Sequence, residues 1–272
     1  MSELDEYLNF AKELAKEAGK IMNRYFRAHD IGTTIKSDST PLTVADTAIN
    51  DLVIEKVKAK YPDHGVIGEE ASFNKSASMF WVVDPVDGTI PFSLGFPFSS
   101  FSLGLVDKKD GQPLVGVIFD PFLDNLYSAV VGKGSYLNAK KIYTSKQETL
   151  QNSYVSICGS FKEDAKTGLY IGSGDYIEAL SDKGAKYFSL LSQAYSAARV
   201  ASGELIGSLF SYGSPWDSAA AAIIITEAGG VVTDLDGKIR RYDRFGKGCI
   251  LSANQKIHQE LLKAAKHAHN RD

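Results

Sequence analysis

The sequence has few cysteines, no long apolar segment and no large excess of one charge. Its two cysteines, Cys158 and Cys249, are far apart, which excludes a disulfide framework and zinc-binding cysteine pairs. Residues 1–6 are acidic where a signal peptide would be basic and then apolar. The longest uninterrupted apolar run, residues 219–225, is much shorter than a membrane-spanning helix. We therefore expect a cytoplasmic protein without a membrane anchor.

The charge balance limits the partners that bulk electrostatics could select. Thirty-three acidic and 30 basic residues give a net charge of −3, which argues against a protein that coats nucleic acid or an anionic membrane. Of the 272 residues, 44% are hydrophobic, and a chain of this size can bury a large core. We expect residues 1–272 to form a single unit, with two subdomains, 1–150 and 151–272, as an alternative.

Hydrophobic periodicity predicts both helices and strands. Apolar residues recur at helical spacing over residues 3–28 and 42–60. Short β-rich runs follow, and the short turns between them favour antiparallel neighbours. The predicted strands of this part are residues 80–83, 98–106, 114–119 and 126–131. In the second half we expect strands at 154–158, 230–233 and 249–251, helices at 190–202, 215–228 and 255–267, and a polar loop at 162–174. The pattern predicts a layered α/β fold with mixed and antiparallel sheets.

Carboxylate side chains gather in three short segments, residues 68–70, 81–89 and 215–230. In the second segment, Asp84 and Asp87 follow an apolar run that predicts a buried strand. Because proline fixes φ and lacks an N–H, the proline after Asp84 predicts an immediate turn of the chain. Such a turn would bring the two aspartates to one point.

The composition of these segments favours a metal ion and an anion. None of the segments contains lysine or arginine, so clustered carboxylates would repel each other unless a cation neutralised them. Mg²⁺ is the preferred candidate because it binds carboxylate and phosphate oxygens, and two such ions can act together on a phosphate. Gly88 lets a ligand approach the main chain closely, where the N–H groups of Gly88 and Thr89 would face an anion.

Each segment also has a purely structural interpretation. The sequence Asp-Pro-Val-Asp-Gly is typical of a turn, and Glu69 and Glu70 could be a solvated pair at the end of a strand. Asp217 fits the start of a helix, with Ser214 as N-cap and Pro215 at the first helical position. The combination of all three segments favours the functional interpretation.

The order and spacing of the segments resemble the inositol monophosphatase family, which belongs to the Mg²⁺-dependent, lithium-sensitive sugar-phosphate phosphatases. The resemblance covers most of the chain. Its four motifs are Lys36-Ser37 with residues 42–46, residues 61–64 with 67–70, residues 84–89, and Trp216-Asp217 with residues 227–230. The resemblance implies alternating helix and sheet layers, a site between two sheet regions, and a homodimer.

The resemblance also implies roles for individual residues. Those that would bind two or three Mg²⁺ ions per subunit are Glu69, Asp84, the carbonyl of Val86, Asp87, Asp217 and, through water, Glu70. The attacking water would be oriented by Thr89, Glu69 and Asp46, and the phosphate would be held by the backbone of Gly88 and Thr89. Spacing alone does not identify Asp46. From the sequence pattern, an exposed position in the first turn of the second helix is the favoured interpretation of this residue. The implied reaction is hydrolysis of a small phosphate monoester by metal-activated water, without a covalent intermediate.

Two departures from the family pattern concern the substrate. Phe210 stands where inositol-selective members have a glutamate, and Leu191-Ser192-Gln193 replaces a cluster of smaller residues. We expect the substrate to contact Asp87, Ser192, Phe210 and Asp217. The prediction is inositol monophosphate or a related sugar or polyol phosphate, with histidinol phosphate, fructose 1,6-bisphosphate and 3′-phosphoadenosine 5′-phosphate as alternatives. A non-catalytic binding relative is less favoured, because every proposed ligand is retained.

The remaining patterns predict structure rather than chemistry. Residues 231–237 and 132–135 match phosphatase and phosphate-loop motifs only in part, and we expect a turn in each. The C-terminal histidines expected to be solvated are His258, His267 and His269. The aromatic residues expected in the core, with a partial role in an interface as the alternative, are Phe92, Phe96, Phe98 and Phe101.

Overall fold

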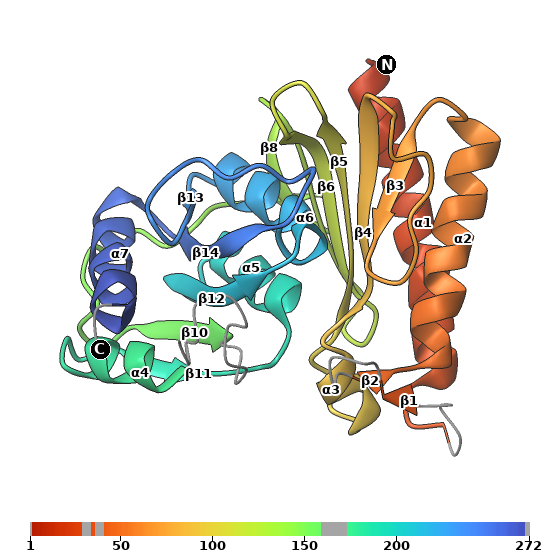
Figure 1. Ribbon diagram of the computed structural model, residues 1–272. Coiled ribbons are helices and arrows are strands. Elements are labelled where there is room, and N and C mark those ends of the chain that lie inside the picture. The colour runs from red at the N-terminus through yellow and green to blue at the C-terminus, as the bar shows by residue number, and fades with distance from the viewer. Residues whose placement is uncertain (1, 29–33, 36–40, 159–172, 270–272) are drawn as a thin grey trace.

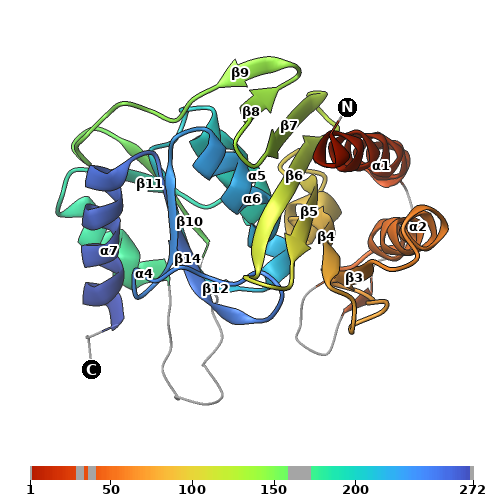
Figure 2. The same ribbon diagram turned by 90° about the horizontal axis from the view of Figure 1, so that it is seen from above.

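The computed structural model describes residues 2–28, 34–35, 41–158 and 173–269, which form alternating layers of helices and sheets (Figure 1). Helices α1 and α2 cover one face of a seven-stranded sheet, and α5 and α6 lie between this sheet and a five-stranded one (Figure 2). Helices α4 and α7 cover the far face of the five-stranded sheet. The helices are α1 (Glu3–Tyr25), α2 (Val44–Lys60), α3 (Thr89–Ser93), α4 (Ser173–Ser181), α5 (Gln193–Ala201), α6 (Pro215–Glu227) and α7 (Gln255–His269). The predicted layered α/β fold is confirmed.

Strands that follow one another in the chain form the seven-stranded sheet, in the order β3-β4-β5-β6-β7-β8-β9. Strands β3 and β4 are parallel, and all other neighbours are antiparallel, as the short connections predicted. The strands are β3 (Gly65–Gly68), β4 (Met79–Asp87), β5 (Ser100–Asp107), β6 (Gln112–Asp120), β7 (Asn125–Val130), β8 (Gly134–Leu137) and β9 (Lys140–Ile142). A separate antiparallel pair consists of β1 (Thr34–Ile35) and β2 (Pro41–Leu42).

The five-stranded sheet is mixed and has the order β11-β10-β12-β14-β13. Strand β10 runs parallel to β11 and β12, whereas β14 is antiparallel to both of its neighbours. The strands are β10 (Tyr154–Cys158), β11 (Lys186–Phe188), β12 (Gly207–Gly213), β13 (Val231–Asp234) and β14 (Gly246–Ser252). Each sheet is built from its own part of the chain, and the division into subdomains 1–150 and 151–272 stays a prediction.

The longest apolar run in the sequence lies in helix α6, which contacts β5 and β6 on one side and β13 and β14 on the other. A helix covered on both sides is apolar all round, and every residue from Ala219 to Ile225 is buried. Gly116 on β6 allows close packing, since a Cβ there would lie 2.5 Å from Ile223 Cγ2. Helix α6 thereby packs close against the seven-stranded sheet. Among the described residues, no helix has both the length and the apolar character needed to cross a membrane.

The turn predictions agree with the structure. The first is the turn at residues 132–135. The carboxylate of Glu227, at the end of α6, fixes this turn by accepting hydrogen bonds from the N–H groups of Gly132 and Gly134, both at 2.7 Å. The second is the turn in residues 231–237, where Asp234 Oδ1 accepts hydrogen bonds from the N–H groups of Asp236 and Lys238. Of the predicted loop at 162–174, residues 162–172 lie outside the described residues. The last two residues of that prediction belong to α4, which begins at Ser173.

Two predictions about burial are wrong. His258 is buried rather than solvated, because its ring nitrogens lie 2.9 Å from Ser252 Oγ and 3.1 Å from Thr233 Oγ1 and so have partners in the interior. The side chains of His267 and His269 lie outside the described residues. The aromatic stretch is divided: two of its rings, Phe92 and Phe101, are buried, whereas Phe96 and Phe98 stack on each other at the surface instead of entering the core.

Candidate active site

A bulge in strand β4 places two aspartates on the same face of the sheet. Asp84 pairs with Ser102 of β5 and Asp87 pairs with Ser100, so three residue steps on β4 match two on β5. Because side chains alternate along a strand, the extra residue turns Asp87 to the side that Asp84 faces. The predicted turn immediately after Asp84 is therefore wrong, since the strand continues to Asp87. The two carboxylates are nevertheless close together.

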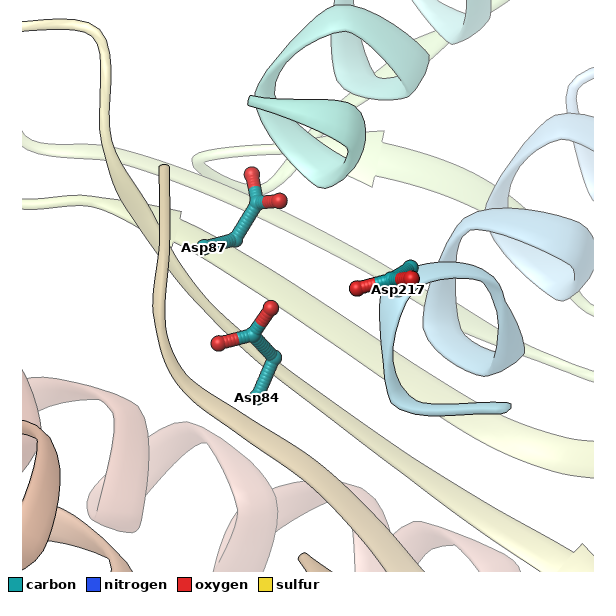
Figure 3. Close-up of side chains that lie close together, drawn as sticks. All are labelled: Asp84, Asp87 and Asp217. Atoms are coloured by element: carbon teal, nitrogen blue, oxygen red, sulfur yellow. The ribbon is translucent and has the colours of Figure 1, made fainter. Parts of the chain in front are cut away.

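Asp217 reaches the same place from the helical layer between the sheets. It lies in the first turn of α6 and points toward Asp84 and Asp87 (Figure 3). Each of the three carboxylates offers an oxygen within 4.8 Å of the other two. Asp84 and Asp87 are each only 3% exposed, so this acidic cluster is largely removed from solvent. Three predicted metal ligands, separated by up to half the chain, are thus side by side.

The N-terminus of helix α5 holds the carboxylate of Asp87. The backbone N–H of Gln193 donates to Asp87 Oδ1 at 2.8 Å, and that of Tyr195 donates to Oδ2 at 3.1 Å. The hydroxyl of Ser192 also donates to Oδ2. A helix N-terminus carries unpaired N–H groups and a partial positive charge, so it stabilises a carboxylate there. In this structure Ser192 positions a predicted ligand, and its contact with a substrate stays a prediction.

Asp217 and Asp46 occupy equivalent positions in two other helices. Each is the acidic member of a capping box: the N–H of Ser214 donates to Asp217 Oδ2 at 2.9 Å, and that of Thr43 donates to Asp46 Oδ2 at 2.8 Å. The capping oxygen leaves the other carboxylate oxygen available to the site. The structural and functional interpretations of Asp217 are therefore compatible. Asp46 does lie in the first turn of α2, but it is fully buried rather than exposed.

Gly88 and Thr89 connect β4 to helix α3. Gly88 has a φ of 83°, and a Cβ there would lie 2.7 Å from Ser192 Cβ, so both conformation and space require glycine. Thr89 Oγ1 lies 3.1 Å from the carbonyl oxygen of Val86 and 3.3 Å from Asp46 Oδ1. Its single proton can be donated to only one of these oxygens at a time. A hydroxyl thus links Asp46 to the end of β4.

Glu69 lies at the end of β3, next to the aspartates. Its N–H donates to the carbonyl oxygen of Val83 at 3.2 Å, which holds it beside β4. Glu69 is outside the group of carboxylates that approach within 4.8 Å of one another, and both Glu69 and Glu70 are half-buried. Their roles as metal ligands remain predictions.

Burial makes the charged form of these carboxylates unfavourable. It raises the pKa of Asp217 to about 8, an effect to which the charges of Glu69 and Asp87 add. Burial likewise raises the pKa of Asp46 to about 6 and holds that of Asp84 well above its usual value. A hard divalent cation with oxygen ligands would offset this cost. The donor set therefore fits Mg²⁺.

Phe210, on strand β12, is fully buried. It packs in a hydrophobic cluster that includes Cys158, Ala194 and Cys249. The structure gives Phe210 a packing role and leaves it no exposed surface for a ligand, so it does not support the predicted contact of this side chain with a substrate.

One arginine that no motif marks lies close to the acidic cluster. Arg240, in the loop between β13 and β14, donates to the carbonyl oxygens of Gly213 and Ser214 at the start of α6. Sequence spacing could not identify it, because it follows the last motif and approaches the site only through the fold.

The hydroxyl of Thr89 allows a direct test of the link to Asp46. Thr89→Val keeps the shape of the side chain and removes the proton-carrying group. The family resemblance implies that this hydroxyl orients the attacking water, so we expect kcat to fall about 100-fold, at the low end of the 10²–10⁴ that positioned proton-transfer groups contribute. Activity against a phosphate monoester should be measured together with the Mg²⁺ concentration for half-maximal rate, which should not change. Thr89→Ser keeps the hydroxyl and should retain most of the activity. A Val variant as active as the Ser variant would contradict a role for this hydroxyl.

Comparison with known proteins identifies the family of the chain. The model of the inositol monophosphatase family matches residues 3–270. Inositol monophosphatase 1 of Solanum lycopersicum is 37% identical over 242 residues, which cover 86% of each chain. The fructose-1,6-bisphosphatase/inositol-1-monophosphatase of Thermotoga maritima is 30% identical over 257 residues, or 94% of each chain. A solved structure of an IMPase from Thermotoga maritima has a TM-score of 0.85 and 28% identity, covering 97% of this chain and 98% of that one. The chain therefore belongs to the inositol monophosphatase family and, as its motifs predicted, is a phosphoric monoester hydrolase.

Proposed function

We propose that the protein hydrolyses a small phosphate monoester in a Mg²⁺-dependent reaction at the acidic cluster. The observation that carries the proposal is the group of the buried Asp84 and Asp87 with the half-buried Asp217, each of which offers an oxygen within 4.8 Å of the other two. Two or three ions per subunit would be held by these residues together with Glu69, the carbonyl of Val86 and Glu70. When bound, Mg²⁺ would neutralise the carboxylates and supply positive charge to the phosphate and the leaving oxygen.

The residues around the cluster supply positioning and proton transfer. As the attacking water loses a proton, Thr89 Oγ1 can accept it and pass its own proton to Asp46 Oδ1, 3.3 Å away. The raised pKa of Asp46, about 6 because of burial, suits a group that takes up a proton near neutral pH. The N–H groups of Gly88 and Thr89 would hold the phosphate where the left-handed turn exposes them.

The substrate that we propose is inositol monophosphate or a related sugar or polyol phosphate. Relatives described as inositol monophosphatases, and one described as acting on fructose 1,6-bisphosphate as well, support this range. We further propose inhibition by Li⁺, a homodimer and a cytoplasmic location, each of which follows from the family resemblance.

A substrate panel with and without metal tests the proposal. Purified protein with Mg²⁺ should release phosphate from at least one of inositol, fructose, histidinol and adenosine phosphates, and EDTA should reduce the rate to background. Release that persists in EDTA would contradict the metal dependence. No release from any member of the panel would favour a non-catalytic binding role.

A further inference from the structure

Arg240 is a buried cation beside the acidic cluster. The three sequence segments that carry the carboxylates contain no lysine or arginine of their own. Arg240 is only 4% exposed. Its Nη2 donates to the carbonyl oxygens of Gly213 at 2.7 Å and Ser214 at 3.0 Å, and its Nη1 donates to that of Lys247 at 2.8 Å. A Cβ at residue 213 would lie 2.7 Å from Arg240 Nη1, so the glycine there makes room for the guanidinium. The loop before α6 is thus built around this side chain.

The hydrogen bonds of Arg240 involve its two terminal nitrogens but do not neutralise its charge. All three acceptors are uncharged main-chain oxygens, and Nε has no partner among the described residues. The ion pairs found in the described part of the chain also do not include Arg240. A buried charge is costly unless an opposite charge lies near it. The ring of Tyr242 lies 5.7 Å from the guanidinium carbon, and the acidic cluster can supply a full negative charge nearby.

A short chain of hydrogen bonds connects Arg240 to that cluster. Arg240 donates to the carbonyl oxygen of Ser214, and the N–H of Ser214 donates to Asp217 Oδ2 at 2.9 Å. Two hydrogen bonds through Ser214 thus separate the guanidinium from the carboxylate. Opposite charges this close interact electrostatically without direct contact.

We infer that Arg240 is a resident counter-charge of the metal site: it partly offsets the carboxylate charge of the metal-free protein, in competition with the bound cation. The inference rests on the proposed function, since it needs a metal to bind at Asp217. It makes Arg240 a positioning and electrostatic residue rather than a catalytic one. The guanidinium of Arg240 and a bound Mg²⁺ both interact with the same carboxylates. Because such coupling is reciprocal, stabilisation of the metal-free cluster by Arg240 must weaken the binding of Mg²⁺.

The test is direct titration of the EDTA-treated and dialysed protein with Mg²⁺ by calorimetry, without substrate. The titration is run at about pH 9, where proton release contributes less to the measured binding. Arg240→Met should lower the melting temperature in EDTA and tighten Mg²⁺ binding about 5-fold or more, a typical coupling between sites. Arg240→Lys keeps the charge and should bind Mg²⁺ like the wild type. Lys238→Met removes an exposed charge from the same loop and should change neither quantity.

The outcomes separate this inference from the proposed function. If the wild type binds Mg²⁺ and hydrolyses phosphate while Arg240→Met binds Mg²⁺ equally or more weakly, only the counter-charge inference is overturned. If Arg240→Lys behaves like Arg240→Met, hydrogen bonding rather than charge is responsible and the inference also fails. If the wild type neither binds Mg²⁺ nor hydrolyses any substrate, both fail together.

A second variant covers the case in which Arg240→Met does not fold. Asp217→Asn removes the negative charge that Arg240 is inferred to offset. The double variant Arg240→Met/Asp217→Asn should therefore fold in EDTA under conditions in which Arg240→Met does not. The absence of this rescue would overturn the inference.

Discussion

Asp84→Asn is expected to lower kcat about 1,000-fold or more while leaving the fold intact. Asp84 is 3% exposed and lies at the bulge of β4, where its carboxylate faces Asp87 and Asp217. Charge stabilisation by bound metal ions supplies several kcal/mol of transition-state energy, and each 1.36 kcal/mol corresponds to a factor of ten in rate. Asparagine keeps the oxygen that accepts the N–H of Val86, so the bulge should persist. The rate should be measured at saturating Mg²⁺ and substrate.

The same substitution should stabilise the protein when no metal is present. In the wild type, burial and the neighbouring charges of Glu69 and Asp87 make the ionised form of Asp84 unfavourable. Removing the charge removes that repulsion, and each kcal/mol relieved should raise the melting temperature in EDTA by roughly 2–4 °C for a chain of this size. Lower activity with higher metal-free stability is the signature of a charge kept for function.

Asp51→Asn is the matched control for Asp84→Asn. Asp51 is exposed on helix α2, so the same chemical change there should affect neither the rate nor the melting temperature in EDTA. An active Asp84→Asn enzyme would show that the metal assignment is wrong. A less stable Asp84→Asn protein in EDTA would show that the carboxylates do not repel each other as their burial implies.

The parts of the fold that depend on local patterns could be predicted from the sequence. The periodic helices α1 and α2 formed where the pattern indicated, because each buries one face against the larger sheet. The β-rich runs formed β4, β5, β6 and β7, and the first three of these strands are buried on both faces because helices cover both sides of the sheet. Strand β12 has no such pattern, since its glycine and serine residues are weak strand formers, and its place between two other strands determines its conformation.

The arrangement of the site depends on contacts between distant parts of the chain, which a local sequence pattern cannot predict. The pairing of Asp84 and Asp87 was expected from a proline-induced turn, whereas the structure achieves it by a bulge in a continuous strand. The capping of Asp87 by α5 joins residues more than 100 positions apart. The burial of Asp46 likewise depends on the layers packed over the first turn of α2. These features depend on tertiary packing, and only the family resemblance indicated Asp46 in advance.

Stabilisation of the folded protein by Mg²⁺ is expected to increase steeply with pH. In the metal-free folded state the pKa of Asp217 is about 8, because burial and the charges of Glu69 and Asp87 disfavour ionisation, against 3.8 for an unperturbed aspartate. Between these two values the folded chain retains a proton that the unfolded chain releases. The contribution of Asp217 to the free energy of unfolding of the metal-free protein therefore falls as pH rises through this window and levels off above about pH 8.

Mg²⁺ reverses this loss because it binds the ionised carboxylates and displaces the proton. For each proton that Mg²⁺ displaces, the apparent affinity for Mg²⁺ should increase about tenfold with each unit of rising pH, up to the pKa of the group that loses the proton. The difference in melting temperature between Mg²⁺ and EDTA should therefore be small near pH 5.5 and large near pH 8.5. Activity at limiting Mg²⁺ should rise over the same range and should level off at a lower pH when Mg²⁺ is saturating. In Asp217→Asn the increase should be shallower, since one titrating ligand is gone. A difference in melting temperature that is independent of pH would show that the cluster is already ionised without metal, and the burial of its charges would then have to be offset by groups other than a bound cation.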